Sequence, residues 1–299
     1  MNTDMIFKGT APALVTPFTP AGDIDEAAFQ QLIDDQISGG VAALVVLGTT
    51  GENPTISHTE RRRLIDLAIA HTAKRVPVIV GSGTYNTQES ITFSKEATAA
   101  GADGLLVVGP YYNKPTPAGY RAHFAAIADA TDCPIIVYNV PGRTASNITA
   151  DLLLELAALP TIVGVKEASG DLAQIADILR NRPEGFAVYA GDDEMAFPCI
   201  ALGAEGVISV ISNACPQPFS HMIQLALEGD FTAARAAHLA MLPAMRACFL
   251  ESNPVPVKTV LAAGGKMHPT VRLPLVPMNQ SSTASVLAAF EPFVAQVSA

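Results

Sequence analysis

Cysteine is scarce in this sequence, and the cysteines present lack the spacing of a metal or redox site. No two of them form a Cys-x-x-Cys pair, and most lie in or beside apolar stretches: Cys133, Cys199, Cys215 and Cys248. Buried thiols of this kind are typical of reduced cytosolic proteins. We therefore expect free core cysteines and a cytoplasmic location.

Long apolar runs and an excess of positive charge are also lacking. No apolar run reaches the roughly 18 residues that a membrane span needs, and Met1–Asp4 does not begin a signal peptide. The net charge of −10 argues against a nucleic-acid partner. The six histidines form no HExxH or similar pair, so we expect no metal site. Our interpretation is a protein that binds neither nucleic acid nor membrane.

Apolar residues are abundant: they make up 49% of the 299 residues, and charged residues make up 15%. Short apolar runs alternate with segments of helical spacing. The runs are continuously apolar, as in parallel strands covered on both faces. They predict strands at residues 13–16, 42–47, 76–80, 104–108, 135–138, 162–166, 186–190 and 206–210.

Eight strands, each followed by a helical segment, predict an α/β fold, the (β/α)8 TIM barrel. An open doubly wound sheet is the alternative, but it would carry a phosphate-binding turn after its first strand, and Thr16–Pro20 is not one. Further helices follow the last strand, and we expect Asn253–Pro256 to end a helical stretch that opens near Phe231. The predicted domains are a barrel over 1–212 and a C-terminal helical region over 213–299, packed on the barrel.

Lys166 is the most informative residue for function. It ends an apolar run that starts at Thr161 and it precedes a polar turn. An amine delivered at the edge of a core has a lowered pKa, because burial disfavours its charged form. Neutral lysines form Schiff bases with carbonyl substrates. The alternative is an ordinary surface lysine after a strand.

Polar or glycine-rich residues follow the other predicted strands, and the carboxyl ends of barrel strands form the active site in this fold. The residues concerned include Thr49, Thr50, Tyr112, Tyr138, Arg143, Gly191 and Ile208. The turn Gly48–Gly51 could bind an anion through backbone N–H groups, or it could be a plain turn. Likewise, the tyrosines could be core phenols and Arg143 a structural ion-pair partner.

Several ordered motifs, taken together, resemble a known family. They are Gly48-Thr-Thr-Gly-Glu52, Tyr138-Asn-Val-Pro-Gly-Arg-Thr144, Gly164-Val-Lys-Glu-Ala-Ser169 and Gly191-Asp-Asp193. The chain resembles the dihydrodipicolinate synthase family of pyruvate-dependent class I aldolases, which also includes N-acetylneuraminate lyase. The resemblance runs from Gly9 to Lys258.

This resemblance implies a lyase of lysine and diaminopimelate biosynthesis that condenses pyruvate with L-aspartate 4-semialdehyde to give 4-hydroxy-tetrahydrodipicolinate. It implies a covalent imine on Lys166 and no metal or organic cofactor. Tyr138 would transfer protons, with Thr49 and Tyr112 as a relay, and Tyr112 would come from a neighbouring subunit. Thr49 and Thr50 would hold the pyruvate carboxylate. Arg143 would bind the semialdehyde carboxylate, and the backbone of Gly191 and Ile208 would line the pocket.

Arg143 favours this substrate over the alternative, a class I pyruvate aldolase acting on a sugar acid or N-acetylneuraminate. A planar guanidinium fits a carboxylate, whereas polyol substrates call for hydroxyl and carboxamide partners. A metal-dependent aldolase and a keto-acid-binding subunit without turnover are further alternatives. The residue types needed for catalysis are all present, which argues against the second of these.

The resemblance also implies assembly and regulation. The family commonly forms a homotetramer, a dimer of dimers. Members that lysine inhibits use a second site at a subunit interface, to which His58, Tyr85, Asn86, Glu89 and Tyr111 would contribute here. Asn53, Arg61 and Tyr85 depart from the pattern of inhibited members, so feedback sensitivity stays open, with a weak preference for its absence.

Overall fold

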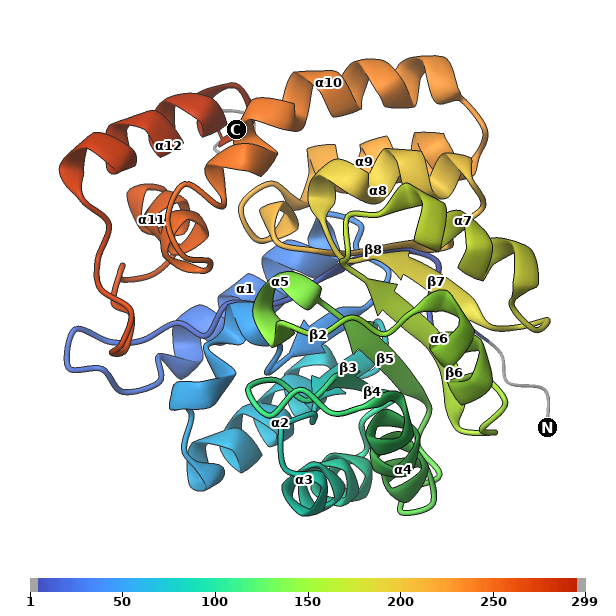
Figure 1. The fold of residues 1–299 in the computed structure, drawn as a ribbon. Helices are drawn as coiled ribbons and strands as arrows, with labels where there is room; N and C mark the ends of the chain where they lie inside the picture. Colours follow the sequence, from blue (N-terminus) through green and yellow to red (C-terminus); the bar gives the residue numbers. More distant parts are fainter. Residues whose placement is uncertain (1–4, 295–299) are drawn as a thin grey trace.

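The computed structural model describes residues 5–294, and helices surround a central sheet in it (Figure 1). The sheet has eight parallel strands in the order β1-β8-β7-β6-β5-β4-β3-β2, so each strand pairs with its neighbour in sequence and β1 pairs with β8. The strands are β1 (Gly9–Pro12), β2 (Leu44–Val46), β3 (Val78–Gly81), β4 (Gly104–Val108), β5 (Ile135–Asn139), β6 (Ile162–Glu167), β7 (Ala187–Ala190) and β8 (Gly206–Ser209).

Backbone hydrogen bonds between the segments of β1 and β2 close the ring. The Ala42 N–H donates to the Thr10 carbonyl at 2.7 Å, and the Leu14 N–H donates to the Val45 carbonyl at 2.9 Å. The predicted (β/α)8 barrel is confirmed.

Helices and short 3₁₀ turns connect the strands and form the outer layer. They are α1 (Glu26–Ser38), η1 (Thr49–Gly51), η2 (Asn53–Thr55), α2 (His58–Thr72), α3 (Thr87–Ala100), α4 (Pro117–Ala128), α5 (Pro141–Thr144), α6 (Ala150–Leu156), α7 (Leu172–Asn181), α8 (Asp193–Ala201), η3 (Ile211–Asn213) and α9 (Pro216–Leu227). The start of α2 follows from local sequence: Ser57 and Glu60 form a capping box, which satisfies backbone N–H groups of the first turn.

The first strand lies earlier than the sequence indicates. We predicted it at residues 13–16, but β1 is Gly9–Pro12, and Ala13 forms only an isolated bridge with Val45. Glycine and proline disfavour strands, so the apolar run after them gives the stronger local signal. Pairing with β8, where Gly9 lies opposite Gly206, fixes the strand instead.

Side chains alternate between the two faces of each strand and so build two apolar layers. Ile136 and Tyr138 of β5 belong to the cluster inside the barrel, whereas Val137 packs in the layer between strands and helices. In β6, Val165 packs in that outer layer, so Lys166 faces the barrel interior.

Up to residue 294, three further helices follow α9, namely α10 (Phe231–Ala247), α11 (Val255–Ala263) and α12 (Gln280–Val294). They lie together along one side of the barrel, where α10 packs against α8 and α9 (Figure 1). Residues 253–256 were expected to end a helical stretch. They instead lead into α11, because proline is tolerated in a helix's first turn.

Helix α9 packs against β1 and lies between α8 and α1, so it completes the barrel wall. We therefore propose that the barrel domain extends through Leu227 and that the C-terminal helical region starts after it, instead of at residue 213. Residues 1–4 and 295–299 of the predicted domains, together with the expected absence of a signal peptide at Met1–Asp4, lie outside the described residues.

The structure also tests the predictions of free core cysteines and of no membrane-spanning segment. All four cysteines are buried and unpaired, as expected. Among residues 5–294, no helix combines the length and the apolar character needed to cross a membrane.

Candidate active site

Lys166 lies near the carboxyl end of β6, inside the barrel, with 5% of its surface exposed. In the sheet it stands between Tyr138 of β5 and Tyr189 of β7. Its Nζ atom lies 4.3 Å from the centroid of the Tyr138 ring. The amine therefore sits against an aromatic wall and not in bulk water.

Burial lowers the pKa of Lys166 to about 8. Asp192 and Asp193 oppose this shift, while Arg143 adds to it. With a pKa near 8, about one amine in ten is neutral at pH 7, against about one in three thousand for an ordinary lysine. The site thus supplies a nucleophilic amine at neutral pH.

The Tyr138 phenol is also buried, and burial raises its pKa to about 12. Arg143 and the Thr49 hydroxyl act in the opposite direction by favouring the charged form, whereas Asp192 raises the pKa further. A phenol in this state keeps its proton at neutral pH and is able to donate it.

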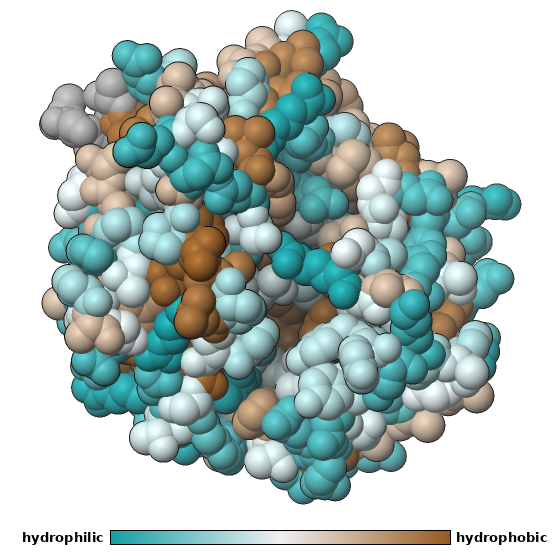
Figure 2. Space-filling model, turned by 60° about the vertical axis from the view of Figure 1, so that its left-hand side comes forward, coloured by the Kyte–Doolittle hydropathy of each residue, from teal (hydrophilic) through white to brown (hydrophobic). Residues whose placement is uncertain are grey.

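A cavity of about 210 Å³ opens at this end of the barrel, and Tyr138 forms part of its wall. The lining comes from the ends of several strands and the turns after them: Leu47, Gly48, Thr49, Asn53, Pro54, Gly81, Gly83, Leu106, Val108, Tyr111, Tyr138, Val140, Arg143 and Thr144. Most of these residues are apolar, so the few polar groups determine how a ligand is oriented. Figure 2 shows one face of the molecule, on which mostly hydrophilic residues surround a hollow with hydrophobic residues in it.

Thr49 and Thr50 lie in η1, the turn after β2. Thr49 is half-buried and lines the cavity. Thr50 is 2% exposed and lies behind the lining, where its Oγ1 accepts a hydrogen bond of 2.9 Å from Asn253 Nδ2. One threonine therefore faces the cavity, and the other is fixed by the C-terminal helical region.

Arg143 is an exposed residue of α5, the short helix after β5, and it lines the cavity. Ile208 and Gly191 are buried near the carboxyl ends of β8 and β7, outside the lining. Gly191 meets a steric limit, because a Cβ atom there would lie 2.5 Å from the Ala168 Cβ. Glycine thus lets β7 approach the segment that follows Lys166.

Tyr112 does not join the other predicted catalytic residues within this chain. It is 90% exposed, it does not line the cavity, and its backbone has a left-handed φ of 68°. The neighbouring Tyr111 lines the cavity instead and packs edge-on against Tyr85, with ring centroids 5.2 Å apart.

The predicted regulatory residues lie around the start of α3. Asn86 caps this helix, Glu89 is exposed in its first turn, and His58 contacts Glu96 at 2.8 Å. Arg61 is buried beside them, donating to Asn53 Oδ1 and to the Gly81 carbonyl, with its guanidinium 4.0 Å from the Phe93 ring centroid. Burial lowers the pKa of Arg61 to about 10, and Glu96 and Glu89 oppose that shift.

Sequence reasoning assigned no role to several residues that act on this site. Burial raises the pKa of Asp192 to about 6, and the nearby Lys166 opposes the shift. Asn253, Lys258 and Arg272 reach the η1 turn from the C-terminal helical region. Lys258 did leave a signal: it is a lone cation in the apolar segment Val255–Ala263, which indicates a buried partner. Over the part of the chain that is described, no group of three or more His, Cys, Asp or Glu side chains is arranged to hold a metal.

Comparison with known proteins identifies the family. The model of the dihydrodipicolinate synthetase family matches residues 6–291. The chain belongs to this family. A relative from Salinibacter ruber, named 4-hydroxy-tetrahydrodipicolinate synthase, is 60% identical over 297 residues, which cover 98% of each chain.

Solved structures of the dihydrodipicolinate synthetase family share the whole fold. The enzyme from Thermotoga maritima superimposes with a TM-score of 0.94 at 38% identity, covering 96% of this chain and 98% of the other. A chloride-inhibited dihydrodipicolinate synthase from Acinetobacter baumannii, solved in complex with pyruvate, gives a TM-score of 0.93 at 38% identity over 95% and 98% of the two chains.

Proposed function

We propose that this chain is a 4-hydroxy-tetrahydrodipicolinate synthase, a lyase of the class I aldolase type that joins pyruvate to L-aspartate 4-semialdehyde. One observation carries the chemistry: the Lys166 amine is buried, its pKa is lowered to about 8, and it lies against the Tyr138 ring beside a cavity. Family membership and the names of the relatives support the substrates and do not favour the sugar-acid alternative.

The reaction begins when the neutral Lys166 amine attacks C2 of pyruvate. Loss of water gives an iminium, which accepts electrons when the pyruvate methyl group loses a proton. The resulting enamine carbon attacks the aldehyde carbon of the second substrate, and the aldehyde oxygen takes up a proton. The amino group of that substrate then attacks the iminium carbon and releases Lys166, which closes the ring.

Each of these steps moves a proton, and Tyr138 is the group placed to do so. Its phenol stays protonated at neutral pH because burial raises its pKa to about 12, and the Thr49 hydroxyl lies near it. We assign proton transfer to Tyr138 and a relay role to Thr49. Thr49, Thr50 and neighbouring N–H groups hold the pyruvate carboxylate, and the backbone of Gly191 and Ile208 borders the reacting atoms.

Trapping the imine tests this proposal. Pyruvate followed by borohydride should add one reduced pyruvate unit to the protein, and peptide mapping should place it on Lys166. Label on another lysine, or no label, would contradict the mechanism. Supplying aspartate semialdehyde, N-acetylmannosamine or glyceraldehyde as second substrate then separates the synthase from the sugar-acid aldolase.

Arg143 is the proposed partner of the semialdehyde carboxylate, because it lines the cavity and carries a planar fork. We expect Arg143→Ala to lower kcat/KM for the semialdehyde about 10–150-fold, the loss of a charge-assisted hydrogen bond. Pyruvate trapping at Lys166 should persist, and Arg143→Lys should give an intermediate rate. Equal use of the semialdehyde by Arg143→Ala and wild type would refute the assignment.

Tyr112 supports a proposal about assembly. It is 90% exposed, and its φ of 68° is unfavourable for a residue with a side chain. We assign it to the proton relay of a neighbouring subunit in a homotetramer, a dimer of dimers. Mixing inactive Lys166→Ala chains with impaired Tyr112→Phe chains should restore activity, because some hybrid sites combine both native residues. No restoration in purified hybrids would refute the shared site.

The proposed chemistry runs through a covalent imine and calls for neither a metal nor an organic cofactor. Activity should therefore survive extensive treatment with a chelator, and its loss would count against the proposal. We also propose a cytoplasmic location, which the unpaired buried cysteines support.

We further propose that lysine does not inhibit this enzyme. His58, Tyr85, Asn86, Glu89 and Tyr111 would form the regulatory surface, but the buried Arg61 already places a cation where the charge of Glu89 acts on it. A second cation there would meet like charge. Millimolar lysine should leave both the rate and the melting temperature unchanged, and clear inhibition would refute this proposal.

A further inference from the structure

The turn after β2 is strained, although it contains residues proposed to bind substrate. Leu47 and Glu52 have left-handed φ values of 59° and 55°, and neither is glycine. Such backbone is unfavourable for residues with a side chain and persists where the surroundings over-determine it. Thr49 and Thr50 lie between these two positions, so their orientation depends on whatever holds the turn.

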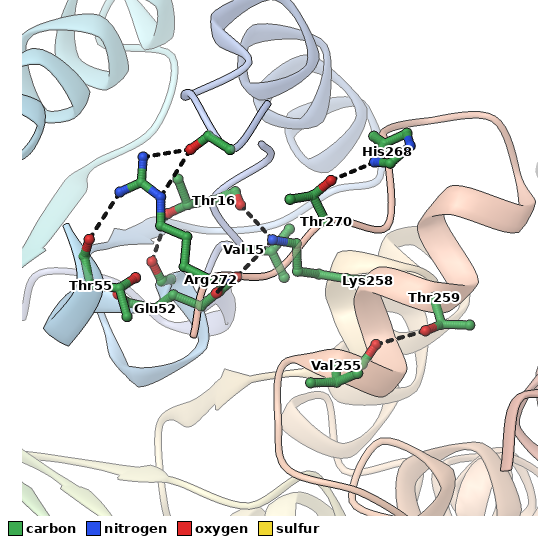
Figure 3. A network of polar contacts seen from close by, with 12 residues as sticks. Val15, Thr16, Glu52, Thr55, Val255, Lys258, Thr259, His268, Thr270 and Arg272 are labelled. Atoms are coloured by element: carbon green, nitrogen blue, oxygen red, sulfur yellow. Dashed lines mark hydrogen bonds and ion pairs between the residues drawn. The ribbon is translucent and has the colours of Figure 1, made fainter. Parts of the chain in front are cut away.

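Glu52 is held by groups from the C-terminal helical region, as Figure 3 shows. Lys258 Nζ, on α11, donates to Glu52 Oε1 at 2.6 Å and to the Thr16 carbonyl at 2.9 Å. The backbone N–H of Arg272 donates to Glu52 Oε2 at 3.0 Å. The Glu52 and Lys258 side chains have no exposed surface, so water does not compete for these bonds.

Two more hydrogen bonds fix the turn at its neighbouring residues. Thr16 Oγ1 donates to the Gly51 carbonyl at 2.7 Å, and Asn253 Nδ2 donates to Thr50 Oγ1 at 2.9 Å. A hydroxyl that accepts from Asn253 must direct its own hydrogen elsewhere. The Thr50 hydrogen is thus left free to donate, which is what a bound carboxylate requires.

We propose that Glu52, Lys258 and Asn253 are positioning residues that hold the η1 turn in the conformation that binds the pyruvate carboxylate. The proposal rests on the function assigned above and adds how the C-terminal helical region takes part in it. These residues act through Thr49 and Thr50 and take no part in the chemistry of the Lys166 amine.

The ionic character of the Glu52–Lys258 contact favours a positioning role over a purely stabilising one. Desolvation makes a buried ion pair a poor source of net stability, and apolar residues of similar volume often stabilise as well or better. The pair instead fixes the orientation of the Glu52 side chain, because its carboxylate has to accept from both Lys258 Nζ and the Arg272 N–H. That requirement selects one geometry for a turn that is locally unfavourable.

A double variant removes the charges together. Glu52→Gln with Lys258→Met keeps the volumes similar and leaves no buried charge unpaired. We expect the KM for pyruvate to rise about tenfold or more, because ground-state carboxylate binding is lost, and kcat to fall by a smaller factor through the Thr49 relay, while the semialdehyde KM is unchanged.

Arg182 and Glu205 provide the matched control. Their ion pair has an Nη1–Oε2 distance of 2.6 Å, is mostly buried and lies at the opposite ends of the strands. Arg182→Met with Glu205→Gln should change thermal stability without changing the pyruvate KM. An unchanged pyruvate KM in the folded Glu52/Lys258 variant, or an equal rise in the control, would overturn the proposal.

Asn253→Ala gives an independent measurement should the double variant not fold. It removes one neutral hydrogen bond to Thr50 and introduces no buried charge. We expect the pyruvate KM to rise about three- to fivefold, which corresponds to one neutral hydrogen bond, and an unchanged KM would count against the proposal. Pyruvate trapping at Lys166 is measured in the wild type in parallel. If trapping fails, the proposed function is refuted. If trapping is normal and the variants have an unchanged pyruvate KM, only the positioning role is refuted.

Discussion

Lys166 and Lys258 are both buried amines packed against an aromatic ring, yet their polar surroundings differ. The Nζ atoms lie 4.3 Å from the ring centroids of Tyr138 and Phe18, respectively. Lys258 pairs with the Glu52 carboxylate at 2.6 Å. Within residues 5–294, no carboxylate forms an ion pair with Lys166, and Asp192 acts on it only through its charge.

This difference separates a reactive amine from a structural cation. Burial lowers the pKa of both lysines. Glu52 opposes that shift at Lys258 both by charge and by accepting a hydrogen bond. The unpaired Lys166 can lose its proton without breaking an ion pair. Burial therefore does not by itself produce a nucleophilic lysine; the absence of a hydrogen-bonded counter-charge is the second requirement.

The largest expected effect on activity comes from removing the reactive amine of Lys166. We expect Lys166→Ala to lower kcat by about 10⁴-fold or more, because the amine proposed to form the imine is lost. The variant should retain its fold, as judged by circular dichroism, and should show no pyruvate adduct after borohydride. Residual activity within tenfold of wild type would mean that another amine carries the chemistry.

Much of the barrel could be predicted because its signals are local. Continuously apolar runs such as 104–108 and 162–166 are strands in the structure, and the Ser57–Glu60 capping box begins α2. β1 was misplaced because its sequence, Gly9–Pro12, has weak strand propensity and depends on pairing with β8. A strand that tertiary contacts define leaves little trace in its own residues.

Part of the site was also predictable from local sequence signals. Lys166, Tyr138 and Thr49 follow or end strands, so the fold alone brings them to one end of the barrel. The contacts of Lys258 and Asn253 with the η1 turn join residues more than 200 positions apart, and no periodicity encodes them. The placement of Tyr112 outside its own cavity likewise depends on a loop conformation with positive φ.

The two lysines should also differ in how they affect stability. Removing the charge of Lys258 should lower the free energy of unfolding, whereas removing that of Lys166 should raise it. Lys258→Met leaves Glu52 buried and uncompensated, so the free energy of unfolding should fall by about 3–5 kcal/mol. Lys166→Met relieves a desolvated charge: its folded pKa lies below the unfolded value, which penalises the native state at pH 7. We expect a gain of about 1–3 kcal/mol there. Urea unfolding of both variants tests this, and changes of the same sign would contradict the proposed difference.

The smallest effect concerns pH. Imine formation needs neutral Lys166, whose pKa is about 8, so the rate of pyruvate trapping should rise roughly tenfold between pH 7 and pH 9 and then level off. Below the midpoint, each unit by which the pH falls lowers the trapping rate by nearly a factor of ten, because the ammonium form of Lys166 does not attack pyruvate. An ordinary lysine would instead keep accelerating up to about pH 10.4, so the position of the plateau distinguishes the two cases.

Asp192 offers a way to move that midpoint without touching the amine. Its carboxylate raises the pKa of Lys166 by favouring the charged form. Asp192→Asn removes this charge, so the midpoint of the trapping profile should shift to lower pH and the rate at pH 7 should rise. Converting Asp192 into a close partner, as Glu52 is for Lys258, would do the reverse. A shift of the Asp192→Asn midpoint to higher pH would show that Asp192 does not stabilise the ammonium, and the distinction between the two lysines would then need another cause.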